Sequence, residues 1–184
     1  RLQHFASRDA MDIEGLGEKA IDQFVDAGLL TSIADIYTLP DRRDAVLALD
    51  RWAPKSFEKL TAGIDKSRSQ PYARVLYALG IRFVGEGVAK ILARAFPTIE
   101  RLQGASIDEL TAVHEIGEAI ATSVREFFYD ADNAELVRVL QSAGLTFAAT
   151  ETGPASTELA GKTFVLTGEL VTMTRKDAEE AIEA

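Results

Sequence analysis

The chain has 184 residues, of which 47% are hydrophobic and 27% are charged. These proportions are typical of globular proteins and exclude a disordered, collagen-like or disulfide-stapled chain. No apolar stretch is long enough to span a membrane, and the first residues lack an apolar signal core, so we expect a soluble cytoplasmic protein without a membrane partner. The sequence has no cysteine and only two histidines, His4 and His114, so we expect no metal site and no thiol chemistry.

The net charge of −9 argues against a nucleic-acid partner, because phosphate contacts are made by lysine and arginine. The charges are segregated, however. Residues 1–41 hold 3 basic and 8 acidic side chains, residues 42–101 hold 12 and 6, and residues 102–184 hold 5 and 15. A basic middle region can attract phosphate even on an acidic protein, since charges beyond about 10 Å are screened. The simpler alternative is a basic helix surface that faces only solvent.

A helical period dominates the sequence as far as about Gly144. Apolar residues recur at spacings of three and four, as in Val88-Ile91-Leu92-Ala95, and alternating strand patterns are nearly absent. Proline and glycine divide this region into short helices joined by short loops. We therefore predict an all-α domain over residues 1–145.

The pattern changes after residue 145. Residues 146–157 are small and polar with a Gly-Pro pair, which predicts a linker. Residues 161–168 are β-branched and aromatic and are bounded by glycines, which predicts a buried strand, and Thr174 is a suitable N-cap for a helix after it. Because chains below about 40 residues rarely fold alone, we expect residues 158–184 to be a truncated part of a second, α/β domain.

An internal repeat appears when Gly17, Ala53, Gly85 and Gly117 are aligned. Their separations of 36, 32 and 32 residues suit one pair of helices per unit. The positions four before, one before, four after and seven after these residues are apolar in all four units. They are Ile13, Leu49, Ile81 and Val113; Leu16, Trp52, Val84 and Ile116; Ile21, Phe57, Ala89 and Ala121; and Phe24, Leu60, Leu92 and Val124. We predict a tandem array of four units, each a helix, a tight turn and a second helix.

The turns have the chemistry of an anion site. In Ile13-Glu14-Gly15-Leu16-Gly17 we expect the glycines to permit positive φ and to allow close approach, because they lack a Cβ. After the second glycine a helix begins, and its free N–H groups and the positive end of its dipole point outward. Several such turns in series are suited to the phosphodiesters of a nucleic-acid strand.

The simpler alternative is that these glycines only cap helices in an array without a ligand. Lys19, Lys55, Arg82 and Lys90 beside the turns favour a phosphate ligand. The second turn, Trp52-Ala53-Pro54, has no glycine, so we expect it to be scaffold and Trp52 to fill the core. The fourth, around Gly117, is flanked by two acidic residues, and its contact with a phosphate is the weakest prediction of the set.

These units are helix-hairpin-helix motifs, and three segments resemble bacterial NAD-dependent DNA ligases. Residues 4–17 resemble the segment after the zinc finger of those enzymes, residues 79–86 resemble their third hairpin, and residues 159–168 resemble the opening strand of their C-terminal BRCT domain. The order and the spacing agree across nearly the whole chain. The resemblance implies a tandem helix-hairpin-helix domain followed by the start of a BRCT domain, cut just after the zinc-binding cysteines.

The resemblance also implies a function without catalysis in this chain. The domain would hold the phosphate backbone of nicked duplex DNA, in replication and repair, while the upstream catalytic domains of the same polypeptide seal the nick. NAD, magnesium and a structural zinc would serve those other domains, and this chain would bind no cofactor and act as a monomer. The implied DNA-binding residues are Gly15, Gly17, Lys19, Arg82, Gly85, Gly87 and Lys90, and with less support Gly117.

Two other functions stay open. DNA glycosylases also carry a helix-hairpin-helix beside a catalytic lysine or aspartate, but they use one unit where this sequence has four. The hairpins could instead pack on partner helices as a protein-interaction array, which a steep salt dependence of DNA binding would exclude. None of the seven lysines lies in the Lys-x-Asp-Gly motif that carries the adenylate in ligases, so we predict no nick sealing by this chain alone.

Overall fold

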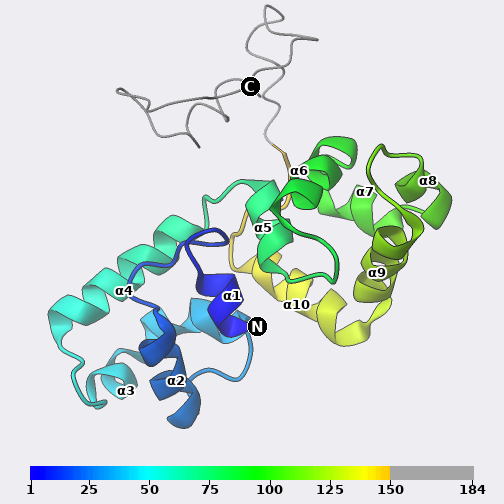
Figure 1. Cartoon of the computed structure of the whole chain (residues 1–184). Helices are drawn as coiled ribbons and strands as arrows, with labels where there is room; N and C mark the ends of the chain where they lie inside the picture. Colours follow the sequence, from blue (N-terminus) through cyan, green and yellow to red (C-terminus); the bar gives the residue numbers. More distant parts are fainter. Residues whose placement is uncertain (150–184) are drawn as a thin grey trace, which may run out of the picture. The chain divides into compact units, whose positions relative to one another are not determined.

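Short helices make up residues 1–149, the part of the chain that the computed structural model describes (Figure 1). Over these residues the prediction of a helical fold is confirmed, and the one extended pairing among them is an isolated bridge between Thr98 and Ala148. No helix in this region is long and apolar enough to cross a membrane. The helices are α1 (Leu2–Ala6), α2 (Glu18–Asp26), the 3-10 helix η1 (Ala34–Arg42), α3 (Arg43–Leu47), α4 (Pro54–Ser67), α5 (Tyr72–Ala78), α6 (Glu86–Ala95), α7 (Ile99–Gly104), α8 (Ile107–Thr111), α9 (Glu118–Tyr129) and α10 (Ala131–Ser142).

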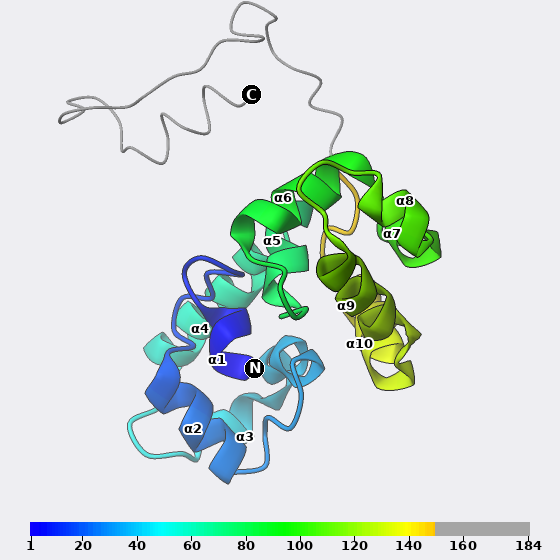
Figure 2. The same ribbon diagram turned by 45° about the vertical axis from the view of Figure 1, so that its right-hand side comes forward.

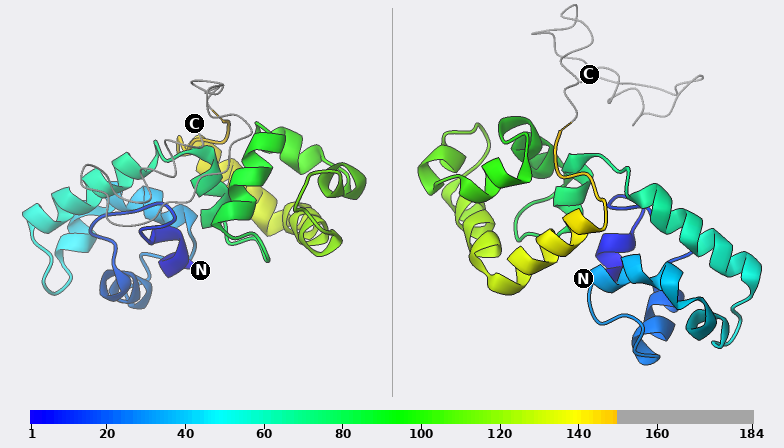
Figure 3. Two further views of the ribbon diagram at one scale, coloured as in Figure 1. Left: turned by 45° about the horizontal axis from the view of Figure 1, so that its top comes forward. Right: turned by 180° about the vertical axis from the view of Figure 1, so that it is seen from behind.

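The helices gather in two groups, α1 to α4 with η1 and α5 to α10, which residues 68–71 connect (Figures 2 and 3). Side chains from the first group bind the second directly. The Nε2 of His4 donates to the carbonyl oxygen of Tyr77 at 2.8 Å, and the two rings meet edge to face with centroids 4.7 Å apart. Arg1 donates to Asn133 Oδ1 at 2.8 Å. The two groups therefore pack as one compact unit, Arg1–Ala149.

The core is built from the repeated apolar positions. Thirteen of the sixteen are buried, and the other three, Leu49, Trp52 and Val113, are half-buried. Trp52 lies on Phe24 with ring centroids 4.9 Å apart, and its Nε1 donates to Gln23 Oε1 at 2.8 Å. Trp52 therefore packs against the core, as predicted, but at its edge, where it is half-buried.

The first repeat unit differs from the expected helix, turn and helix. Its leading helix, α1, ends at Ala6, and the chain reaches Ile13 through a loop. Ser7 explains the early end, because its hydroxyl donates to the carbonyl oxygen of His4 at 2.6 Å and its own carbonyl accepts from Asp12 at 2.9 Å. Such local bonds compete with the helical ladder. The loop is closed by Ile13 N–H, which donates to Ala6 at 3.1 Å.

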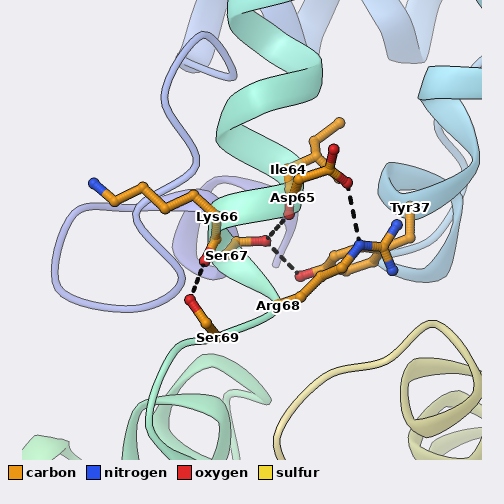
Figure 4. A network of polar contacts seen from close by, with 7 residues as sticks. All are labelled: Tyr37, Ile64, Asp65, Lys66, Ser67, Arg68 and Ser69. Atoms are coloured by element: carbon orange, nitrogen blue, oxygen red, sulfur yellow. Dashed lines mark hydrogen bonds and ion pairs between the residues drawn. The ribbon is translucent and has the colours of Figure 1, made fainter.

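A polar network fixes the end of α4 against η1 (Figure 4). The Ser67 hydroxyl donates to the carbonyl oxygen of Ile64 at 2.7 Å, so the Tyr37 hydroxyl, 3.1 Å away, is the donor to Ser67. Burial raises the pKa of Tyr37 to about 12, which keeps this hydroxyl protonated at neutral pH. Arg68 lies 5.1 Å from the centroid of the same ring and pairs with Asp65 at 3.4 Å. The end of α4, from which residues 68–71 lead to α5, is thus held against η1 by side chains.

Residues 146–149, which the sequence assigns to the start of the linker, pack as part of this unit. Phe147 is buried, and its carbonyl oxygen accepts from Ile99 N–H at 3.0 Å. Thr146 donates to the carbonyl oxygen of Arg68 at 3.2 Å. The buried ring of Phe147 is the reason that the folded unit extends past residue 145. The rest of the predicted linker and the predicted α/β segment, residues 150–184, lie outside the described residues.

Candidate nucleic-acid interface

One turn geometry recurs at four places in the chain. The residue two before each aligned position has a positive φ: +89° at Gly15, +66° at Arg51, +65° at Phe83 and +69° at Glu115. The next residue donates its N–H to the carbonyl three residues before it, at distances between 3.0 and 3.3 Å. These bonds join Leu16 to Ile13, Trp52 to Leu49, Val84 to Ile81 and Ile116 to Val113. The same turn is therefore made whether or not a glycine is present.

The glycines at the aligned positions do not serve the turn conformation. Gly17, Gly85 and Gly117 are the N-caps of α2, α6 and α9, with φ of −77°, −80° and −82° and extended ψ. Any residue adopts these angles. The expectation that the glycines of the first turn permit positive φ is therefore correct for Gly15 and wrong for Gly17.

Close packing within the fold does not explain these three glycines either. A Cβ added to Gly17, Gly85 or Gly117 would meet no atom within 4 Å, and the same holds for Gly87 in the first turn of α6. The fold therefore has room for a side chain at each of these places. Because the side chain is missing, the backbone at the start of each of these helices stays accessible.

Other helices of the unit begin differently. The side chains of Thr98, Ser106 and Asp130 accept hydrogen bonds from the backbone at the starts of α7, α8 and α10, at 3.3, 3.1 and 2.9 Å. A glycine N-cap offers no such acceptor, so the outward N–H groups of α2, α6 and α9 receive no bond from their N-cap side chains. Free N–H groups and the positive end of the helix dipole attract an anion.

The second turn is built as a poorer anion site. Its N-cap, Ala53, already donates its N–H to the Ser56 hydroxyl at 2.9 Å. Pro54 follows as the first residue of α4 and has no N–H to donate. The start of α4 therefore lacks one N–H and has its N-cap N–H already bonded, as expected for a unit that acts as scaffold.

Gly15 allows a close approach of backbone, as expected from its lack of a Cβ. A Cβ at Gly15 would lie 3.1 Å from Leu60 Cα, and a Cβ at Gly63 would lie 2.9 Å from Glu14 N and closer still to the Glu14 carbonyl oxygen. The backbone of the first turn thus rests directly on α4, between Leu60 and Gly63. Gly63 belongs to no motif of the repeat, and only the tertiary contact reveals its function.

The predicted cations lie beside the turns, in two places. Lys19 is exposed in the first turn of α2, next to Gly17. Arg82 is exposed in the third turn, and Lys90 on α6 pairs with Glu86 at 3.8 Å. The predicted residues therefore fall in two groups along the chain, one around Gly85 and one around Gly17, each with a cation near a glycine N-cap in the sequence.

Acidic groups also lie beside the turns, and a glutamate follows each glycine N-cap: Glu18, Glu86 and Glu118. In the first turn Glu14 lies 3.0 Å from Lys59 Nζ, and the hydrogen bond from Lys59, with the charges of Lys59 and Lys66, holds the pKa of Glu14 below its usual value. In the fourth, Glu115 and Glu118 stand on either side of Gly117, and Glu115 is 3.6 Å from the exposed ring of His114. The first turn is partly neutralised by α4, whereas the fourth is the most acidic of the four.

Residues 74–137, which contain the third and fourth turns, match the family described as "Helix-hairpin-helix motif".

Over nearly its whole length the chain is similar to bacterial DNA ligases, which confirms the resemblance noted in the sequence. It is 45% identical over 99% of its residues to a protein named DNA ligase from Symbiobacterium thermophilum, and 47% identical over 98% of its residues to one from Thermomicrobium roseum. The matched segment covers 27% and 26% of those proteins. The chain thus spans about a quarter of the length of these curated relatives.

Proposed function

We propose that this chain is the DNA-holding part of an NAD-dependent DNA ligase, and that its four helix-hairpin-helix units form one array whose first, third and fourth turns lie on the backbone of nicked duplex DNA. The observation that carries the proposal is that α2, α6 and α9 each begin after a glycine N-cap. Neither the φ angle of these glycines nor the packing around them requires the absence of a side chain. Backbone donors read phosphates without reading bases. This suits an enzyme that must accept a nick in any sequence.

The sealing reaction itself is placed in other domains of the ligase. NAD and magnesium serve the transfer of an adenylate to a lysine and then to the 5′-phosphate, and no lysine of this chain has the Lys-x-Asp-Gly context for that step. Gly15, Gly17, Gly85, Gly87 and, more weakly, Gly117 would supply backbone contacts. Lys19, Arg82 and Lys90 would neutralise phosphates near them.

The test is a fluorescence-anisotropy titration of the 184-residue chain with nicked and intact duplexes of one sequence at several salt concentrations. We expect log K to fall with log salt at a slope of about −3, because each of three cations would release counterions from one phosphate. Tighter binding of the nicked duplex would assign nick preference to this chain. Absence of binding at low salt would contradict the proposal. It would favour the protein-interaction array, in which the acidic surface would select the partners.

A second prediction concerns the acidic fourth turn. Glu118→Gln removes the negative charge at the first position of α9, where it repels a phosphate approaching Gly117. We expect DNA affinity to rise by about twofold to fivefold at low salt, and thermal stability to fall slightly because the carboxylate favours the positive end of the helix. Glu126→Gln, an equal change near the other end of α9, is the matched control and should leave affinity unchanged. Equal affinities of both variants and the wild type would show that the fourth turn does not touch DNA.

A further inference from the structure

Phe83 occupies a position that the fold does not explain. It is 54% exposed and has a φ of +65°, which is rare for a bulky residue and costs conformational energy. The equivalent residues of the other turns are Gly15, Arg51 and Glu115, so nothing in the turn requires an aromatic side chain. An exposed, strained aromatic residue that adds nothing to the core indicates a contact made outside the chain.

The ring of Phe83 is held in place beside the start of α6. The guanidinium of Arg82 lies 4.6 Å from the ring centroid, which is within the range of a cation–π contact. Gly85 follows two residues later, and two residues span at most about 7 Å. The ring and the guanidinium therefore belong to the turn that leads directly into α6.

We propose that Phe83 packs against the apolar face of the nucleotide whose phosphate binds at the start of α6. Each phosphate of a strand is joined to sugars with apolar C–H faces, and a base exposed at a gap offers an apolar face as well. A ring that covers either surface removes apolar area from water, which amide and cation contacts do not do. This inference rests on the proposed function and adds a non-electrostatic contact to it.

The test compares Phe83→Asn with the wild type in anisotropy titrations on an intact duplex and on a duplex with a one-nucleotide gap. Asn accepts the left-handed conformation better than Phe, so the melting temperature should not fall. We expect DNA affinity to fall by about tenfold. The slope of log K against log salt should stay unchanged, since no cation is lost. Phe83→Tyr, which keeps the ring, should retain the wild-type affinity.

Tyr129→Asn is the matched control, because Tyr129 is 87% exposed but lies at the end of α9 farthest from its glycine N-cap. Its DNA affinity should equal that of the wild type. An equal loss for Phe83→Asn on both duplexes would identify a sugar contact, and a larger loss on the gapped duplex would identify an exposed base. If Phe83→Asn binds both duplexes as tightly as the wild type, the inference is overturned while the proposed function stands; failure of the wild type to bind DNA would overturn both.

Discussion

Gly85→Asp should raise the free energy of unfolding and at the same time remove most of the affinity for DNA. Gly85 is the N-cap of α6 in an extended conformation with open space around its Cα. An aspartate there can accept from the first N–H groups of the helix and favours its dipole, which should stabilise the domain by about 0.5 kcal/mol. The same carboxylate occupies the donors meant for a phosphate and repels it, so we expect affinity to fall by about a hundredfold.

Urea unfolding and anisotropy titrations on the same preparation measure both effects. Gly85→Val separates bulk from charge: it keeps the site neutral but fills the open space, and we expect a loss of affinity of about tenfold. Thr98→Asp adds an equal charge at the N-cap of α7, where a side chain already caps the helix, and should bind DNA like the wild type. A Gly85→Asp variant that is more stable and binds DNA normally would refute a phosphate site at α6.

Gly63→Ala should destabilise the domain by about 3 kcal/mol, although alanine is the better helix former. The added Cβ would collide with the backbone of Glu14, which cannot move aside as a flexible side chain could. The first turn must then separate from α4, which exposes Leu16 and Leu60, both buried in the native packing. The midpoint of urea unfolding, at an unchanged slope, reports this change.

Gly87→Ala is the control for this substitution. Gly87 is also helical, but its Cβ would meet nothing within 4 Å, so the change should stabilise the chain by a few tenths of a kcal/mol through helix propensity. If Gly63→Ala were as stable as the wild type, the close contact between the first turn and α4 would be refuted. DNA binding through the third turn should persist in Gly63→Ala at temperatures where the chain stays folded.

Hydrophobic spacing in the sequence predicts the positions of the core well. The sixteen aligned apolar residues are all buried or half-buried, because a helix that must pack on its neighbours repeats its apolar residues at the period of its turns. Trp52 illustrates this: its place in the alignment, and not its chemistry as an aromatic residue, predicts that it packs on Phe24.

Backbone conformation and tertiary contact were less predictable. Arg51, Phe83 and Glu115 adopt the left-handed conformation that favours glycine, because apolar residues on both sides of each of them, buried or half-buried, fix the turn. In the sequence Gly63 is an ordinary residue inside a helix, and only the contact between α4 and the first turn shows why it is a glycine. The early end of α1 depends on hydrogen bonds of one serine, which composition cannot reveal.

The return of residues 146–149 toward the middle of the unit has a mechanical consequence. Ala149 donates to the carbonyl oxygen of Pro97 at 2.7 Å, and Thr146 is bonded to Arg68. A pull on the polypeptide after Ala149 is therefore transmitted first to the start of α7 and the end of α4. The glycine N-caps of α2, α6 and α9 are not members of this set of contacts. A pulling force on the chain and a ligand at the glycine N-caps would thus act on separate parts of one small unit.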